Sequence, residues 1–162
     1  MRRRAGSSLF IVALLALLHF GLSPWLGDRR VAPDFLFLAL MVYAIRVRPG
    51  AAAVAGFSVG ILRDSIAVLG FGAEALAHTV VGYLAAWGKA VFFADNLIVN
   101  AGFFFAGVWL RDVLVLLGGG MPLGGILWQF FFWSVLKALT TAAAGVVVLL
   151  MFRNWLDVRI SD

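Results

Sequence analysis

Residues 123–152 read LGGILWQFFFWSVLKALTTAAAGVVVLLMF and contain a single charged side chain, Lys137. An apolar run of about 17 to 25 residues is long enough to cross the roughly 30 Å hydrocarbon layer of a bilayer as an α-helix. This run is longer than that range, so we expect its helix to be tilted or to protrude from the bilayer at one end. Such a helix needs lipid around it, and the sequence therefore indicates an integral membrane protein.

Five further apolar runs precede this one, at residues 8–25, 31–47, 50–69, 72–88 and 97–117. The connections between them are short and carry turn signals such as Arg48-Pro49-Gly50. Short connections make consecutive helices antiparallel neighbours. The sequence thus predicts an all-α integral membrane protein, a single domain built as a compact bundle of about six transmembrane helices.

The composition supports this class and argues against an enzyme. Hydrophobic residues make up 64% of the chain and charged residues 13%, whereas soluble domains are roughly half apolar and about a quarter charged. With no cysteine and two histidines, neither a thiolate metal site nor a histidine-based metal centre is expected. The sequence has no phosphate-binding glycine loop and no serine-nucleophile motif. We therefore expect no catalysis and no cofactor.

The basic residues predict the orientation of the bundle. With the N-terminus in the cytoplasm, the outer loops hold only Arg29 and Arg30. The cytoplasmic segments then hold Arg2, Arg3, Arg4, Arg46, Arg48, Lys89, Arg153 and Arg159. An excess of Lys and Arg on the cytoplasmic side is typical of membrane proteins. We therefore expect both termini to be cytoplasmic, and the positive charge to meet anionic lipid headgroups rather than nucleic acid.

The third run carries small residues at a spacing of four, because Ala52, Gly56 and Gly60 lead to Asp64. Residues four apart lie on one face of a helix, and small residues on such a face let two membrane helices approach closely. We therefore expect Gly56 and Gly60 to form a helix–helix contact on which assembly with partners depends.

Charged side chains within the runs are costly to insert, and each one indicates pairing or function. Arg63-Asp64 lies in the third run, and Arg111-Asp112 lies at matching depth in the fifth. The first pair either closes a local ion pair or serves a partner or substrate, and the two pairs could also cross-pair near the outer surface. Lys137 lies near mid-membrane, and we expect Asp64 or Asp112 to be its partner.

Three further ionisable positions lie at or near the ends of the runs. Glu74 begins the fourth run, and His78 follows one turn later. Such a pair could move a proton or hold a cation, but the simpler expectation is a hydrogen bond between the two. Asp34 follows Pro33 at the start of the second run, where an acid suits a helix N-terminus, so we expect helix capping. His19 is expected to be an interfacial histidine.

Aromatic residues gather early in the sixth run, at Trp128, Phe130, Phe131, Phe132 and Trp133. On a helix these side chains would point to nearly all sides. Two interpretations stay open for them: lipid contact with bundle packing, or a docking face for another transmembrane helix.

Four motifs follow one another in the first half of the chain. They are Pro33-Asp34 before an apolar run, the turn Arg48-Pro49-Gly50, the segment GFSVGILRD at 56–64 and the turn LGFGAEAL at 69–76. This ordered set resembles the family of the rod shape-determining protein MreD, in which similar motifs occur at similar spacing. One departure is Glu74, which stands where members of the family often carry a histidine or a neutral residue.

The resemblance implies a non-catalytic scaffold in the inner membrane of a rod-shaped bacterium, a subunit of the cell-elongation complex that supports peptidoglycan synthesis and rod cell shape. The implied partners are the bitopic protein MreC, the MreB filament, the glycosyltransferase RodA and its paired class B transpeptidase. MreD-like proteins are also similar in architecture to the substrate-binding subunits (S-components) of energy-coupling-factor vitamin transporters. The alternative is therefore a vitamin-binding subunit with its ligand near the outer charges. A proton-coupled transporter using Glu74, His78 or Lys137 is less favoured, because no inverted repeat is visible.

Overall fold

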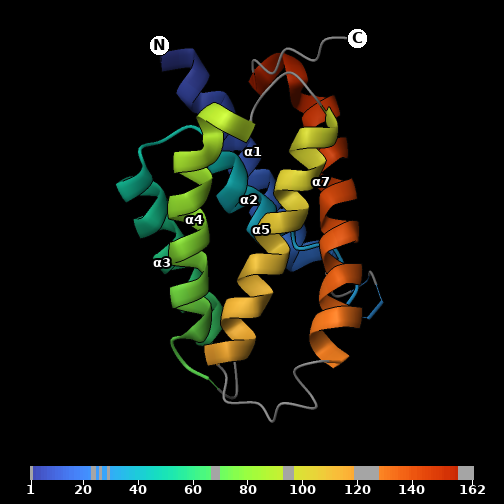
Figure 1. Cartoon of the computed structure of the whole chain (residues 1–162). Coiled ribbons are helices and arrows are strands. Elements are labelled where there is room, and N and C mark those ends of the chain that lie inside the picture. Colours follow the sequence, from blue (N-terminus) through green and yellow to red (C-terminus); the bar gives the residue numbers. More distant parts are fainter. Residues whose placement is uncertain are drawn as a thin grey trace.

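The computed structural model describes residues 2–22, 25, 27–28, 30–66, 70–92, 97–118 and 128–156, and its regular elements are all helical. The α-helices are α1 (Arg2–Leu22), α2 (Phe35–Ala44), α3 (Pro49–Asp64), α4 (Ala73–Phe92), α5 (Leu97–Gly118) and α7 (Val135–Leu156). A short π-helix, η2 (Gln129–Ser134), leads directly into α7. The start of α1 and the end of α7 lie at the same end of the bundle (Figure 1). The predicted all-helical bundle is confirmed for the described part of the chain.

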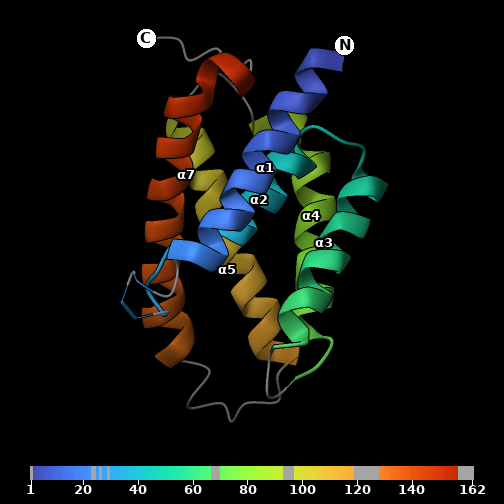
Figure 2. The same ribbon diagram turned by 180° about the vertical axis from the view of Figure 1, so that it is seen from behind.

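The short helix α2 forms the centre of the bundle. It contacts each of the other α-helices, and Figure 2 shows α1 passing in front of it. Eight of its ten residues are buried, as expected for a helix that is apolar on all sides. Phe37 and Met41 are among its buried side chains, and they share the core with Phe104 and Val108 of α5.

The second predicted span, 31–47, is longer than the helix that forms there. Ten residues extend about 15 Å at 1.5 Å per residue, which is half of the roughly 30 Å hydrocarbon layer. Among the described helices, α5 and the segment Gln129–Phe152 are each long and apolar enough to cross a membrane. The prediction of a full-length second helix is therefore wrong. Ala32 and Asp34, in the non-helical stretch before α2, are buried in the protein, as membrane proteins require of irregular backbone.

Helices α3 and α4 form the most extensive helix–helix contact, and they lie side by side in both views (Figures 1 and 2). A Cβ added at Gly56 would lie 2.1 Å from the carbonyl oxygen of His78, and one at Gly60 would lie 2.3 Å from the Cα of Ala75. Both positions therefore require glycine. The predicted helix–helix contact is present, and it lies within the chain, covered by α4.

The turn between α3 and α4 also depends on glycine. Gly70 and Gly72 have φ angles of +74° and +97°, in the left-handed region that glycine adopts without steric penalty. The backbone N–H of Ala73 donates to the carbonyl of Gly70 at 3.0 Å and begins α4. This turn places Glu74 beside the last residue of α3, Asp64, at the same end of the bundle.

Candidate functional site

Charged side chains from several helices meet where α2 begins, and Asp34 lies at their centre, only 3% exposed. Its Oδ1 accepts a hydrogen bond from the backbone N–H of Phe37 at 3.0 Å, which makes it the predicted N-cap of α2. Arg63 of α3 also binds this oxygen. Arg111 of α5 and Lys137 of α7 approach the other oxygen, Oδ2, at 3.6 and 3.9 Å. The Asp34 carboxylate thus caps the central helix and forms ion pairs with three cationic side chains.

Arg111 links α5 to α4 by a two-pronged contact. Its Nε donates to Oε2 of Glu74 at 3.2 Å, and its Nη2 donates to Oε1 at 3.0 Å. Its Nη1 binds the neighbouring carboxylate of Asp112. A bidentate pair of this kind is strong and directional. Because the guanidinium is buried, these carboxylates supply the partners that a charge removed from water requires.

Asp64 has a different role, which is to cap α4 from the end of α3. Its Oδ1 accepts from the backbone N–H of Glu74 at 3.2 Å, and its Oδ2 accepts from that of Ala75 at 2.9 Å. The first N–H groups of a helix have no partner inside it, and the helix dipole favours a carboxylate there. Asp64 therefore fastens the start of α4 to α3.

Two of the predicted ion pairs are wrong. Arg63 binds Asp34 rather than Asp64, because Asp64 is turned toward the start of α4. The ion pair found for Lys137 in the described part of the chain is also with Asp34, and not with Asp64 or Asp112. Arg63 and Arg111 do come together, but through Asp34 rather than by cross-pairing. The charged side chains pair with Asp34 because α2 is short. Its N-terminal cap, Asp34, therefore lies inside the bundle among the charged residues.

Glu74 and His78 form the expected local hydrogen bond. Nδ1 of His78 lies 3.2 Å from Oε2 of Glu74 and 2.9 Å from the carbonyl oxygen of the same residue. The imidazole is fully buried and meets the ring of Phe37 edge-on. His78 therefore belongs to the packed interior, whereas Glu74 is partly exposed, with its side chain 17% accessible.

Sequence reasoning missed two polar contacts of Asp34. Its backbone N–H donates to the buried hydroxyl of Thr141 at 3.0 Å. Thr141 lies four residues after Lys137, and this shared face is the signal that could have found it. His19 lies 3.7 Å from the Asp34 carboxylate, and its Nδ1 accepts from the backbone N–H of Leu36 at 3.4 Å. His19 is therefore hydrogen-bonded, as a satisfied histidine is expected to be, and it also lies beside the charged cluster.

A cavity of about 290 Å³ opens beside this cluster, and we call it the charged cavity. Its lining includes Arg63, Glu74, Arg111, Asp112 and Lys137, so α3, α4, α5 and α7 all contribute to its wall. The described residues contain no group of three or more His, Cys, Asp and Glu side chains that could hold a metal ion. The carboxylates are instead held by arginines or by a helix N-terminus.

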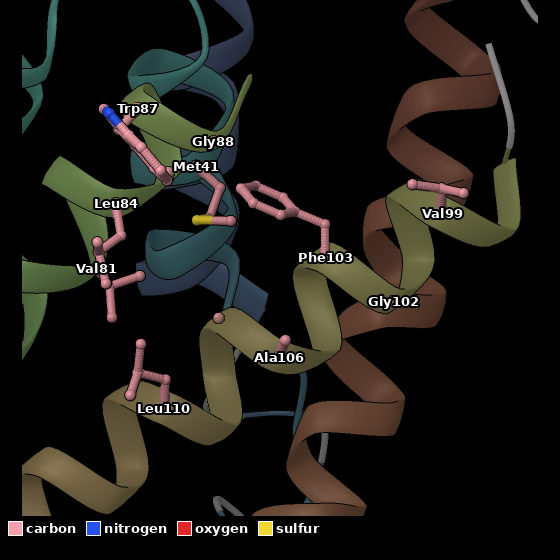
Figure 3. Close-up of a pocket in the computed structure, with 12 residues that line it drawn as sticks. Met41, Val81, Leu84, Trp87, Gly88, Val99, Gly102, Phe103, Ala106 and Leu110 are labelled. Atoms are coloured by element: carbon pink, nitrogen blue, oxygen red, sulfur yellow. The ribbon is translucent and has the colours of Figure 1, made fainter. Parts of the chain in front are cut away.

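A second hollow is apolar and runs between α4 and α5 (Figure 3). This α4–α5 groove has a volume of about 470 Å³. Its lining is Met41 of α2, Val81, Leu84, Ala85, Trp87 and Gly88 of α4, and Val99, Gly102, Phe103, Ala106, Gly107 and Leu110 of α5. A Cβ added at Gly102 would meet no atom within 4 Å. The groove is therefore open where the α3–α4 contact is closed.

The aromatic cluster lies on and beside η2 and combines internal packing with exposure. Phe130 packs against Trp109 of α5, with ring centroids 4.7 Å apart. Trp128 and Phe131 are 64% and 69% exposed. Exposed tryptophan near the end of a membrane helix is typical of the membrane–water interface.

The described part of the chain is an all-helical bundle whose buried charges tie its helices to one another, and two of its helical segments are long and apolar enough to cross a membrane. The family model described as rod shape-determining protein MreD matches residues 1–157. The chain therefore belongs to the MreD family, and it is a non-catalytic, rod shape-determining membrane protein of the elongasome, of the inner-membrane type. No curated protein and no solved structure gives a significant match. The family match extends well beyond the motifs at 33–85 and favours the rod-complex function over the vitamin-transporter alternative.

Proposed function

We propose that this protein is a lateral scaffold of the rod complex, and that the single transmembrane helix of MreC packs in the α4–α5 groove. The observation that carries the proposal is the openness of this groove at small residues. Among the described residues, no atom lies within 4 Å of a Cβ added at Gly102, and Ala106, one turn along α5, is exposed. Small residues let the backbones of two membrane helices approach. A partner helix would complete the packing that the chain leaves open here.

The α3 face that carries Gly56 and Gly60 is not available to a partner, because α4 covers it. Gly56 and Gly60 lie against the backbone of α4, so no partner helix reaches them without separating α3 from α4. Gly56 and Gly60 then affect assembly with partners indirectly, because they allow α3 and α4 to pack together. Within the described residues, the α4–α5 groove combines small residues with open space.

The orientation that we propose places both termini in the cytoplasm and the charged cavity toward the outer face of the inner membrane. The excess of basic residues near the termini supports it, as does the common position of the start of α1 and the end of α7. We propose that, in this orientation, MreB contacts the cytoplasmic end of the protein. RodA and its class B transpeptidase contact it within the plane of the membrane. The likeness to S-components stays a prediction.

Co-purification with MreC tests this function. We expect Gly102→Leu to lower the recovery of MreC with the tagged protein about tenfold, the equivalent of about 1.4 kcal/mol, because the new side chain fills the groove. The matched control is Gly21→Leu, which puts the same side chain into open space on α1. Equal recovery of MreC with both variants would rule out the groove as the binding face.

A further inference from the structure

The charged cavity is lined by two residues with buried hydrogen-bond donors for which the described residues provide no acceptor. Ser134 lines the cavity and is 1% exposed, and its Oγ has no hydrogen-bond partner among the residues that the structure describes. The Nε–H of Arg63, another lining residue, is also buried, and no partner for it lies in the described part of the chain. Buried polar groups in proteins nearly always have a partner. Two such donors on residues that line one cavity are available to an acceptor from outside the chain.

The charge of the cavity lining favours a negatively charged acceptor. The basic lining residues are Arg30, Arg63, Arg111 and Lys137, and the acidic ones are Glu74 and Asp112. Both acidic side chains are bound by Arg111. Asp34 is shared by three cations, and its distance to Lys137 is 3.9 Å. Arg63 and Lys137 thus have positive charge to offer to a ligand in the cavity.

The local helix geometry supports a binding role for this wall. Ser134 is the last residue of the π-helix η2, one turn before Lys137. Segments of π-helix are rare and often occur at functional sites. Trp133 of η2 also lines the cavity, and the guanidinium of Arg30 lies 5.2 Å from the centre of its ring. This cation–π contact holds a further cation at the cavity.

We propose that the charged cavity binds a phosphate-type oxyanion through Arg63, Ser134 and Lys137. A guanidinium matches the geometry of phosphate oxygens, and an ammonium adds a compact charge. The hydroxyl of Ser134 donates a third hydrogen bond. This chemistry suits free phosphate and the phosphate of a lipid headgroup alike. The site is separate from the α4–α5 groove, so the proposal does not depend on MreC binding.

Thermal unfolding of the purified full-length protein in dodecyl maltoside, titrated with inorganic phosphate at constant ionic strength, tests the site. A ligand that binds the folded state raises the melting temperature. We expect Ser134→Ala to weaken phosphate binding about tenfold, because the lost hydrogen bond is made to a charged group. The matched control is Ser58→Ala, which removes an exposed hydroxyl that donates to the carbonyl of Val54 on α3; it should bind like the wild type.

A second arm identifies the source of the phosphate. Native mass spectrometry of the same variants counts retained phosphatidylglycerol molecules. A phosphate-induced shift that is lost in Ser134→Ala supports a free anion, and a bound lipid that is lost in Ser134→Ala supports a headgroup. The proposal is overturned if the wild type binds neither probe, or if Ser134→Ala and Ser58→Ala behave alike. Recovery of MreC is read separately, so failure here leaves the proposed function testable.

Discussion

Helix α4 makes two contacts that use small residues in opposite ways. Against α3, Gly56 and Gly60 let the backbones meet so closely that no Cβ fits. Against α5, Gly102 and Ala106 leave the α4–α5 groove open. The α4–α5 pair is held instead by the Arg111–Glu74 contact at one end. The same residue type thus closes one helix pair and leaves space beside the other.

The difference separates positions that maintain the fold from positions available to a partner. Where a glycine faces backbone, its replacement must move a helix. Where it faces open space, its replacement changes only what can bind there. We therefore expect substitutions at the closed contact and at its polar supports to affect stability, and substitutions in the groove to affect assembly.

The largest effect is expected at the ion pair that holds α5 to α4. Arg111→Met should lower the free energy of unfolding by about 3–5 kcal/mol, because it leaves buried carboxylates without a partner. Denaturation of the purified protein in detergent measures it. Combining Arg111→Met with Glu74→Gln should recover part of the loss, since the two residues are coupled. A loss under about 1 kcal/mol for Arg111→Met would show that this pair does not support the helix contact.

The closed contact should be the next most sensitive. Gly60→Leu is expected to cost about 3 kcal/mol, because the side chain would overlap the backbone of α4 at Ala75 and force the helices apart. The same denaturation experiment measures the loss, with Gly21→Leu as the control on α1. Equal stability of these two variants would contradict the close approach of α3 and α4.

A smaller effect is expected at the cap that joins α3 to α4. Asp64→Ala should cost about 1–2 kcal/mol, because the N–H groups of Glu74 and Ala75 lose their acceptor. Asp64→Asn keeps one side-chain oxygen and should lose less than Asp64→Ala. If both variants are as stable as the wild type, the cap contributes nothing to the α3–α4 contact.

The smallest effect on stability is expected in the groove. Gly102→Leu should leave the free energy of unfolding unchanged or raise it by up to about 1 kcal/mol, because glycine is a poor residue in a helix interior. Thermal unfolding of Gly102→Leu, compared with that of Gly60→Leu, measures this change in stability. A large loss in Gly102→Leu would mean that the groove is closed in the folded protein and is not a free surface.

Much of the fold could be predicted from apolar runs and turn residues. The run at 97–117 corresponds to α5, and the four-residue spacing of Gly56 and Gly60 identified a close helix contact. The short α2 could not be predicted, because a run of apolar residues has the same appearance whether lipid or protein surrounds it. Its burial on nearly all sides is a tertiary property.

The sequence identified most of the charged residues of the candidate site, but it did not predict which of them form ion pairs with one another. Arg63, Arg111 and Lys137 were each identified as charges that need a partner, and Asp34 was identified as a helix cap. The spacing of residues along a helix determines which side chains lie on the same side of that helix. It does not determine which other helix packs against that side. Asp34 became the common partner because α2 starts inside the bundle, and Asp64 became a cap because the glycine turn brings α4 back beside it.

The most direct test of the central claim is site-specific cross-linking in membranes that contain MreC. The chain has no cysteine, so one can be introduced at Ala106 in the groove or at Val54, which is 67% exposed on α3. After labelling with a photoreactive maleimide and illumination, we predict that MreC is captured from Ala106→Cys and not from Val54→Cys. Capture from Val54→Cys, or equal capture from both positions, would contradict docking of MreC in the α4–α5 groove.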